Sequence, residues 1–191
     1  LILQFYFKTG DYTLLLGCLG ALPGFFYSTR PIRLVERGLG ELFIAFCYGW
    51  LPVACAYYIQ TATIRPVIHW ISLPIGLSIF NVILLNEFPD YEADMATGKR
   101  NLLQRAGKKT AVVIYAVSSV MASLAVCGLP FCCGVPFRVL YFYAPVFAVA
   151  LFIVVMMLRG QYKDPKTLES LCGLNIIVNL GTSFSFLLAY L

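Results

Sequence analysis

The residues of this chain best suited to chemistry lie together in one polar stretch between long apolar segments. Four of the nine acidic residues fall within eight positions: Glu87, Asp90, Glu92 and Asp94. Asn86, Asp90 and Asp94 are spaced four residues apart, so on a helix they form one polar stripe. Two carboxylates and an amide at a membrane surface suit a hard cation such as Mg²⁺, which in turn holds phosphate or diphosphate groups. The spacing therefore predicts Asp90 and Asp94 as metal ligands and catalytic residues, with Asn86 beside them at the diphosphate.

A basic pair follows the acidic residues and would complete such a site. Lys99 and Arg100 are placed to neutralise a diphosphate, Arg100 through a bidentate contact of its guanidinium group. Glu87 and Glu92 point away from the stripe, at about 100° per residue, and are predicted to be helix N-terminal charges instead of ligands. The alternatives are that the acidic helix is an ordinary solvated surface helix and that the basic pair only anchors the chain at the membrane surface.

The rest of the chain is too apolar for a soluble domain. Hydrophobic residues make up 60% of the sequence and charged residues 12%, and the mean hydropathy is +0.83. Six runs contain no Asp, Glu, Lys or Arg: 12–29, 42–64, 66–86, 110–137, 139–158 and 170–191. Each run is close to the roughly 20 residues that a helix needs to cross a bilayer, although the first is short and the fourth must include a loop. The sequence predicts an all-α polytopic membrane bundle of about six transmembrane helices, forming one domain over residues 1–191.

The distribution of basic residues predicts the orientation of the bundle. When the connections are assigned alternately to two sides, eleven of the fourteen Lys and Arg residues fall on one side, and the other receives Lys8, Arg65 and Arg138. The excess of positive charge marks the cytoplasmic side, so the stretch with Asp90 and Asp94 is predicted to be cytoplasmic. Topology and anionic phosphate groups explain these basic residues better than nucleic-acid binding, and no nucleic-acid partner is expected.

Local signals predict short helices that would form a cap on the cytoplasmic face. Pro89 fits the first turn of a helix and Gly98 fits its end, which predicts a short helix over Pro89–Thr97. A second short helix is expected over Leu102–Arg105, ending at Gly107.

Other polar residues have simpler explanations. Arg30, Arg33 and Arg37 could border a diphosphate or only anchor the topology, and Glu41 could pair with Arg37 or with an arginine of the cap. His69 is expected to be a packed, hydrogen-bonded histidine and not a base. The seven cysteines are expected to pack as small apolar residues without forming a metal site. The alternative is a disulfide within the outer cluster of Cys127, Cys132 and Cys133.

These features together resemble a known family of membrane enzymes. The run from Asn86 to Gly107 has the pattern N-x3-D-x3-D-x3-G-K-R-x-L, which resembles the second aspartate-rich motif of the UbiA superfamily of membrane prenyltransferases. The upstream segments 27–33, 37–41 and 57–61 are similar to the branch that prenylates 1,4-dihydroxy-2-naphthoate in menaquinone synthesis. The resemblance covers essentially the whole chain.

The resemblance implies a nine-helix bundle around a cavity that opens to lipid. In this family two aspartate-rich motifs face each other and hold Mg²⁺ on a polyprenyl diphosphate. The diphosphate leaves, an allylic cation forms, and an aromatic acceptor attacks the cation. The implied function is Mg²⁺-dependent transfer of a polyprenyl group to an aromatic acceptor in quinone biosynthesis, specifically that of menaquinone, in the inner or plasma membrane of a bacterium or archaeon.

One part of the family pattern is missing from these residues. The acids within residues 1–85 are Asp11, Glu36 and Glu41, which lack the spacing of a first aspartate-rich motif. The chain is therefore expected to correspond to the C-terminal two-thirds of a family member, with half a metal site and no activity alone. Three alternatives remain open. The first is a UbiA-type enzyme that uses hydroxybenzoate, homogentisate or a lipid as acceptor. The second is a CDP-alcohol phosphotransferase, whose D-G-x2-A-R signature the chain lacks, and the third is a non-catalytic membrane protein.

Overall fold

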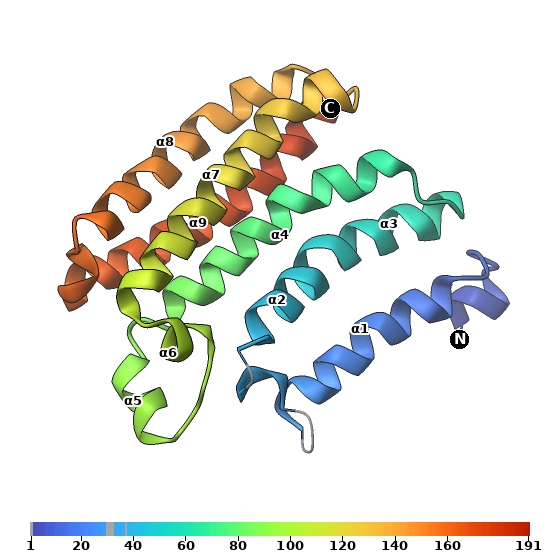
Figure 1. The fold of residues 1–191 in the computed structure, drawn as a ribbon. Helices are drawn as coiled ribbons and strands as arrows, with labels where there is room; N and C mark the ends of the chain where they lie inside the picture. The colour runs from blue at the N-terminus through green and yellow to red at the C-terminus, as the bar shows by residue number, and fades with distance from the viewer. Residues whose placement is uncertain (1, 30–32, 37) are drawn as a thin grey trace.

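The computed structural model describes residues 2–29, 33–36 and 38–191. All regular secondary structure in these ranges is helical, which confirms the all-α prediction (Figure 1). The six charge-free runs correspond to six apolar helical segments. These are α1 (Thr13–Ser28), the continuous helix Gly40–Thr61, α4 (Pro66–Asn86), α7 (Lys108–Cys132), α8 (Arg138–Leu158) and α9 (Pro165–Tyr190).

Five of these six segments are long and apolar enough to cross a membrane, as in an integral membrane protein. The exception is α1, whose 16 residues are fewer than the roughly 20 of a full span. The loop predicted within the fourth run is confirmed, because α7 ends at Cys132. The last helix begins at Pro165, five residues before its charge-free run, because the Asp164 carboxylate caps it by accepting a hydrogen bond from Thr167 N (2.9 Å).

The helix Gly40–Thr61 consists of α2 (Gly40–Ala45), a wider π-helical turn η3 (Phe46–Trp50) and α3 (Leu51–Thr61). It crosses α4 at very short range, because a Cβ atom on Gly49 would lie 2.4 Å from the Cα of Gly76. Only glycine allows two backbones to approach this closely. The contact holds α2 against α4 and brings the start of one helix near the end of the other.

The main core lies between α4, α7, α8 and α9, which pack together on one side of the molecule while α1 and the helix Gly40–Thr61 extend it on the other (Figure 1). Neutral hydrogen bonds, here called the amide pairs, join three of these helices. They are Asn81–Ser119 (2.8 Å), Asn179–Ser78 (2.8 Å) and Tyr115–Asn175 (2.9 Å). Such bonds stabilise helix association where no water competes.

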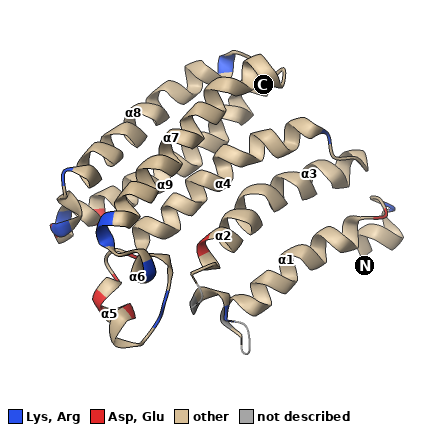
Figure 2. Ribbon diagram, in the orientation of Figure 1, with Lys and Arg blue, Asp and Glu red and all other residues tan. Residues whose placement is uncertain are grey.

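The remaining elements are short and lie at the ends of the long helices: η1 (Ile2–Tyr6), η2 (Leu34–Glu36), α5 (Tyr91–Ala96), α6 (Leu102–Ala106) and η4 (Gln161–Lys163). Residues 87–107, which include α5 and α6, are called the cap below. Most Lys and Arg residues that the structure describes lie at the cap end, whereas Lys8, Arg65 and Arg138 lie at the opposite end (Figure 2). This division agrees with the alternation of loops used to predict the orientation.

Candidate functional site

The acidic stretch folds into a turn followed by two short helices. Residues 87–90 form the turn, and α5 begins at Tyr91 with Asp90 as its N-cap. The predicted helix therefore exists, but it starts later than expected and Pro89 lies in the turn that precedes it. The second helix, α6, ends at Gly107 with a positive φ of 79°, as the glycine predicted.

The predicted stripe of Asn86, Asp90 and Asp94 forms only in part. Asp90 and Asp94 are one turn apart, joined by a hydrogen bond from Asp94 N to Asp90 O of 2.8 Å. Asn86 is the last residue of α4 and belongs to a different helix. The idea of one continuous helical stripe was wrong because the chain turns between α4 and α5.

Asp94 is the best-held carboxylate of the cap. Its Oδ2 accepts hydrogen bonds from Lys99 Nζ (2.8 Å) and from Asn101 Nδ2 (2.9 Å). The side chain is 14% exposed, and that of Lys99 is 31% exposed. Both contacts use Oδ2, so Oδ1 takes part in neither of them. A carboxylate with one oxygen fixed in this way is pre-oriented for a further electropositive partner.

Asn86 and Asp90 lie in a large hollow at the cap end of the bundle. Its volume is about 710 Å³, and both residues are exposed to it. The lining carries charges of both signs, with Glu92 and Glu169 opposed by Lys108 and Lys163. Lys108 bonds to Glu92 (3.3 Å) and sits 4.1 Å from the centre of the Tyr91 ring. The hollow thus has oxygen atoms that can bind a hard cation and lysine side chains that can bind an anion.

Lys99 and Arg100 border a second hollow of about 430 Å³, together with Met95, Gly98, Gln104 and Arg105. The five predicted site residues are therefore divided between two hollows of the same cap. Asn86 and Asp90 lie in the first, and Lys99 and Arg100 lie in the second. Asp94 is bound to Lys99 and so belongs with the second group.

The N-terminus of α6 is held by side chains that sequence reasoning did not assign to the site. Glu41 Oε1 accepts from Leu102 N (2.9 Å), and Glu87 Oε2 accepts from Leu103 N (3.3 Å). Glu41, at the start of α2, is only 1% exposed. Glu87 was expected to be a helix N-terminal charge, and it is one, but for α6 instead of α5. The sequence feature that points to Glu41 is an acidic residue at the start of an apolar helix.

Two pKa values in the cap are shifted by these contacts. Burial, followed by the neighbouring Glu41 carboxyl group, raises the pKa of Glu87 to about 9, although Leu103 N and Lys99 oppose the rise. Burial alone would lower the pKa of Lys99, but its bond to Asp94 outweighs this and raises the pKa above its ordinary value. Lys99 therefore remains a cation throughout the neutral range.

The residues present fit a Mg²⁺ ion that is shared with a ligand. Mg²⁺ usually takes one or two carboxylates, and water and phosphate oxygens complete its shell. Asp94 offers one such carboxylate, because its Oδ1 is not used by Lys99 or Asn101, and Asp90, one helical turn away in the first hollow, offers another. Within residues 2–29, 33–36 and 38–191 no cluster of three or more His, Cys, Asp or Glu side chains could hold a metal by itself. The donor set therefore suits a cation that a phosphate ligand helps to bind.

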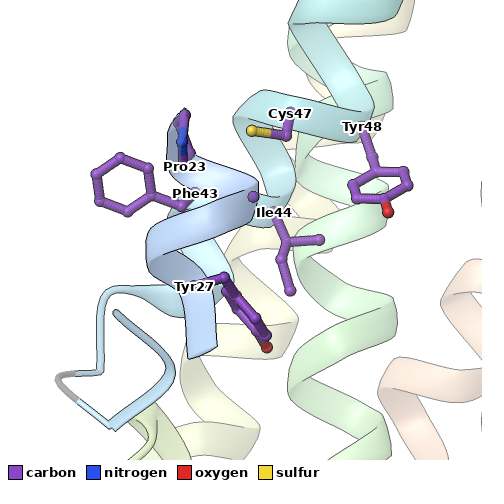
Figure 3. Close-up of a pocket in the computed structure, with 7 residues that line it drawn as sticks. Pro23, Tyr27, Phe43, Ile44, Cys47 and Tyr48 are labelled. Carbon is purple, nitrogen blue, oxygen red and sulfur yellow. The ribbon is translucent and has the colours of Figure 1, made fainter. Parts of the chain in front are cut away.

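An apolar hollow of about 190 Å³ lies between α1 and the helix Gly40–Thr61 (Figure 3). Its lining is largely aromatic and aliphatic: Pro23, Gly24, Tyr27, Phe43, Ile44, Cys47 and Tyr48. Tyr27, near the end of α1, interacts electrostatically with Glu41, Lys99 and Glu87 of the cap region. An apolar space thus adjoins the charged groups of the cap.

The secondary sequence predictions have mixed outcomes. His69 is hydrogen-bonded and packed on a neighbour as predicted, because its Nδ1 accepts from Trp50 Nε1 (2.8 Å) and its ring stacks on that of Trp50, although the residue is exposed. All seven cysteines are free thiols, which excludes the disulfide alternative in this structure. Arg30 and Arg37 lie outside the described residues, and so does the suggested pairing of Glu41 with Arg37.

Comparison with known proteins gives the chain relatives of one kind. It is 33% identical over 115 residues to a 1,4-dihydroxy-2-naphthoate octaprenyltransferase of Bacillus subtilis, which covers 60% of this chain and 37% of that protein. It is 30% identical over 168 residues to a 2-carboxy-1,4-naphthoquinone phytyltransferase of Synechocystis, which covers 87% of this chain and 53% of that protein. A 1,4-dihydroxy-2-naphthoate octaprenyltransferase of Escherichia coli is 30% identical over 100 residues, 51% of this chain and 32% of its own length. No solved structure matches the chain.

These matches span about half or less of the relatives' own lengths. The model of the UbiA prenyltransferase family matches residues 1–179, which include all six apolar helices apart from the end of α9, and the whole cap. The chain therefore belongs to the UbiA prenyltransferase family.

Proposed function

We propose that this chain carries the diphosphate-binding cap of an enzyme that transfers a polyprenyl group to an aromatic acceptor. The observation that supports this most directly is the Asp94 carboxylate, bound by Lys99 (2.8 Å) and Asn101 (2.9 Å) within the motif typical of the family. The named acceptors of the three relatives are naphthalene-type ring systems. We therefore infer a naphthoate acceptor and a role in menaquinone-type quinone biosynthesis.

Each residue has a defined part in this proposal. Lys99 and Arg100 neutralise the diphosphate as the bond between its oxygen and the allylic carbon breaks. An aromatic carbon of the acceptor bonds to the allylic carbon, and the proton of that ring position then leaves. Mg²⁺ bound by Asp90 and Asp94 would supply further positive charge to the leaving diphosphate. The apolar hollow beside Tyr27 suits the hydrocarbon part of the donor.

We also propose that the cap is cytoplasmic and that a first aspartate-rich motif outside these 191 residues completes the site. The excess of basic residues at the cap end supports the orientation. Residues 1–85 contain three acids and no motif of the required spacing, which supports a separate source for the second set of carboxylates. This chain alone would then bind diphosphate weakly and would not catalyse transfer.

The test is a transfer assay in membranes that contain the full genomic reading frame of the protein. Labelled prenyl diphosphate is supplied with 1,4-dihydroxy-2-naphthoate, 4-hydroxybenzoate, homogentisate or a glycerol phosphate lipid, with Mg²⁺ or with EDTA. We expect Mg²⁺-dependent labelling of the naphthoate. Labelling of another acceptor would identify a UbiA-type enzyme of different specificity, and no transfer to any acceptor would favour a non-catalytic membrane protein.

A further inference from the structure

The first turn of α6 is held almost entirely by side chains from other parts of the chain. A helix leaves its first N–H groups without partners inside the helix. In α6 the amides of Leu102, Leu103 and Gln104 are bound by Glu41 Oε1 (2.9 Å), Glu87 Oε2 (3.3 Å) and Asn101 Oδ1 (2.9 Å). A five-residue helix has little stability of its own, so these three bonds help to hold α6 in place, together with the burial of Leu103 in the main core.

The two glutamates come from two long helices and meet at this point. Glu41 lies at the start of α2, 61 residues before Leu102, and Glu87 directly follows α4. Burial and the neighbouring Glu41 carboxyl group raise the pKa of Glu87 to about 9, so Glu87 is protonated at neutral pH and the two groups do not both carry charge. Glu41 Oε2 is buried and accepts no hydrogen bond in the described part of the chain.

Asn101 links the position of α6 directly to the Asp94 carboxylate. Asn101 uses Oδ1 to cap α6 and Nδ2 to bind Asp94 Oδ2 (2.9 Å). Asn101 is 1% exposed, so it has no freedom to make these two contacts separately. A displacement of α6 would therefore move Asn101 and release one of the two bonds that orient Asp94.

We propose that Glu41 and Glu87 are positioning residues that hold α6 in place and thereby keep Asp94 and Lys99 arranged for a metal-bound diphosphate. The inference rests on the proposed function for its substrate and on the hydrogen bonds of Glu41, Glu87 and Asn101 for its geometry. Through these contacts the Asp94 carboxylate is linked to α2 and to the end of α4. These glutamates act through Asn101 and do not touch the diphosphate themselves.

The kinetic test uses the full genomic reading frame and measures the Mg²⁺ concentration that gives half-maximal transfer. Alanine at both positions (E41A/E87A) is expected to raise this concentration, and the KM for prenyl diphosphate, by about tenfold or more, as is usual when a residue supporting a metal ligand is lost. The single variants Glu41→Gln and Glu87→Gln keep an acceptor for the α6 amide and a partner for the other carboxyl. Each is expected to stay within about twofold of the wild type.

A matched control separates positioning from general destabilisation. Asn175→Ala removes a buried hydrogen bond to Tyr115 within the bundle and leaves the cap contacts intact. It is expected to lower the unfolding temperature without changing the Mg²⁺ requirement. If Asn175→Ala shifts the Mg²⁺ requirement as much as E41A/E87A does, or if alanine at both glutamates shifts nothing, the positioning role is refuted.

Hydrogen exchange provides a readout that does not depend on catalysis. In E41A/E87A the amides of residues 94–106 should exchange at least about tenfold faster than in the wild type, whereas amides of α7 and α8 should be unchanged. Unchanged exchange over 94–106 would overturn the inference even if the enzyme is active. If the wild type transfers no prenyl group but exchange over residues 94–106 is still faster in E41A/E87A, the proposed function would be overturned and the positioning contacts supported.

Discussion

The bundle of α4, α7, α8 and α9 and the cap use polar side chains in opposite ways. Inside the bundle the amide pairs join neutral groups, such as Asn81 with Ser119 (2.8 Å). In the cap the contacts involve charge, such as Lys99 with Asp94 (2.8 Å). Placing a charged side chain within the membrane costs far more free energy than placing it at the surface. Neutral pairs therefore join the helices, and charged pairs lie in the cap, where a ligand could bind. The comparison predicts that cap variants change activity and that bundle variants change stability.

The largest expected effect is that of Asp94→Ala. Loss of the carboxylate removes a predicted metal ligand and the partner of Lys99, so kcat/KM for prenyl transfer should fall by about a thousandfold or more. The unfolding temperature in detergent should change little, because Asp94 lies outside the bundle. Retained activity in this variant and in Asp90→Ala would remove the metal role from both residues.

Lys99→Ala should have the next largest effect. The ammonium group of Lys99 is held next to the Asp94 carboxylate, and its loss should raise the KM for prenyl diphosphate by about tenfold, with a smaller change in kcat. Lys99→Arg keeps the charge and is expected to recover most of the affinity. Equal KM values in all three proteins would show that Lys99 only anchors the chain at the membrane surface.

The raised pKa of Glu87 predicts a pH dependence of the cap. Glu87 has a pKa of about 9 in the folded protein against an ordinary value of 4.5, so the folded state binds this proton more tightly than the unfolded chain does. The resulting stabilisation is fully present below pH 4.5 and is lost as the pH rises through about 9. Exchange of the α6 amides should therefore accelerate between pH 7 and about 10 after correction for intrinsic rates, and Glu87→Gln should weaken this trend. A pH-independent corrected rate in the wild type would contradict the protonation of Glu87 at neutral pH.

A bundle variant should show the reverse pattern. Asn81→Ala removes the hydrogen bond to Ser119 and is expected to cost about 1 kcal/mol of unfolding free energy in detergent or bicelles. The Mg²⁺ requirement and the KM for prenyl diphosphate should stay within about twofold of the wild type. A large change in either constant would show that the amide pairs also shape the site.

The smallest effect is expected for Glu92→Ala. Glu92 is an acid of the same cap, but its side chain is 73% exposed and its partner is Lys108 at 3.3 Å. Exposed ion pairs contribute little, so the free energy of unfolding should change by less than about 0.5 kcal/mol. Transfer activity close to that of the wild type, measured beside Asp90→Ala, would show that position on the cap matters and acidity alone does not.

The long helices could be predicted from the sequence because their signals are local. A charge-free run of sufficient length defines a span, and the predicted run 66–86 coincides with α4 (Pro66–Asn86). The end of α6 at Gly107 also follows from local chemistry, since a positive φ favours glycine. The start of α5 differs from the prediction. Proline is favoured both in the first turn of a helix and in turns between helices, and Pro89 lies in the turn that follows α4.

The candidate site could be predicted only in its composition. Asp90, Asp94, Lys99 and Arg100 were found from spacing, and all four lie in the cap. Their division between two hollows was not predictable, because it depends on how α5 and α6 fold back against the bundle. The same applies to Glu41, whose bond to Leu102 N joins positions 61 residues apart. No periodicity in the sequence encodes a contact between two such distant segments.

The close approach of Gly49 to Gly76 has a consequence at the membrane surface. At the contact between the two glycines the helices cross, and the helix Gly40–Thr61 runs eight residues back from Gly49 to Glu41, whereas Glu87, directly after α4, lies eleven residues beyond Gly76. At about 1.5 Å per residue these two segments are roughly 12 Å and 16 Å long. A methyl group added at Gly49 would force the two backbones apart at this contact and change the distance between Glu41 and Glu87 at the ends of the two segments. The spacing of two carboxyl groups in the cap is thus set in the apolar interior, by two residues that have no side chain.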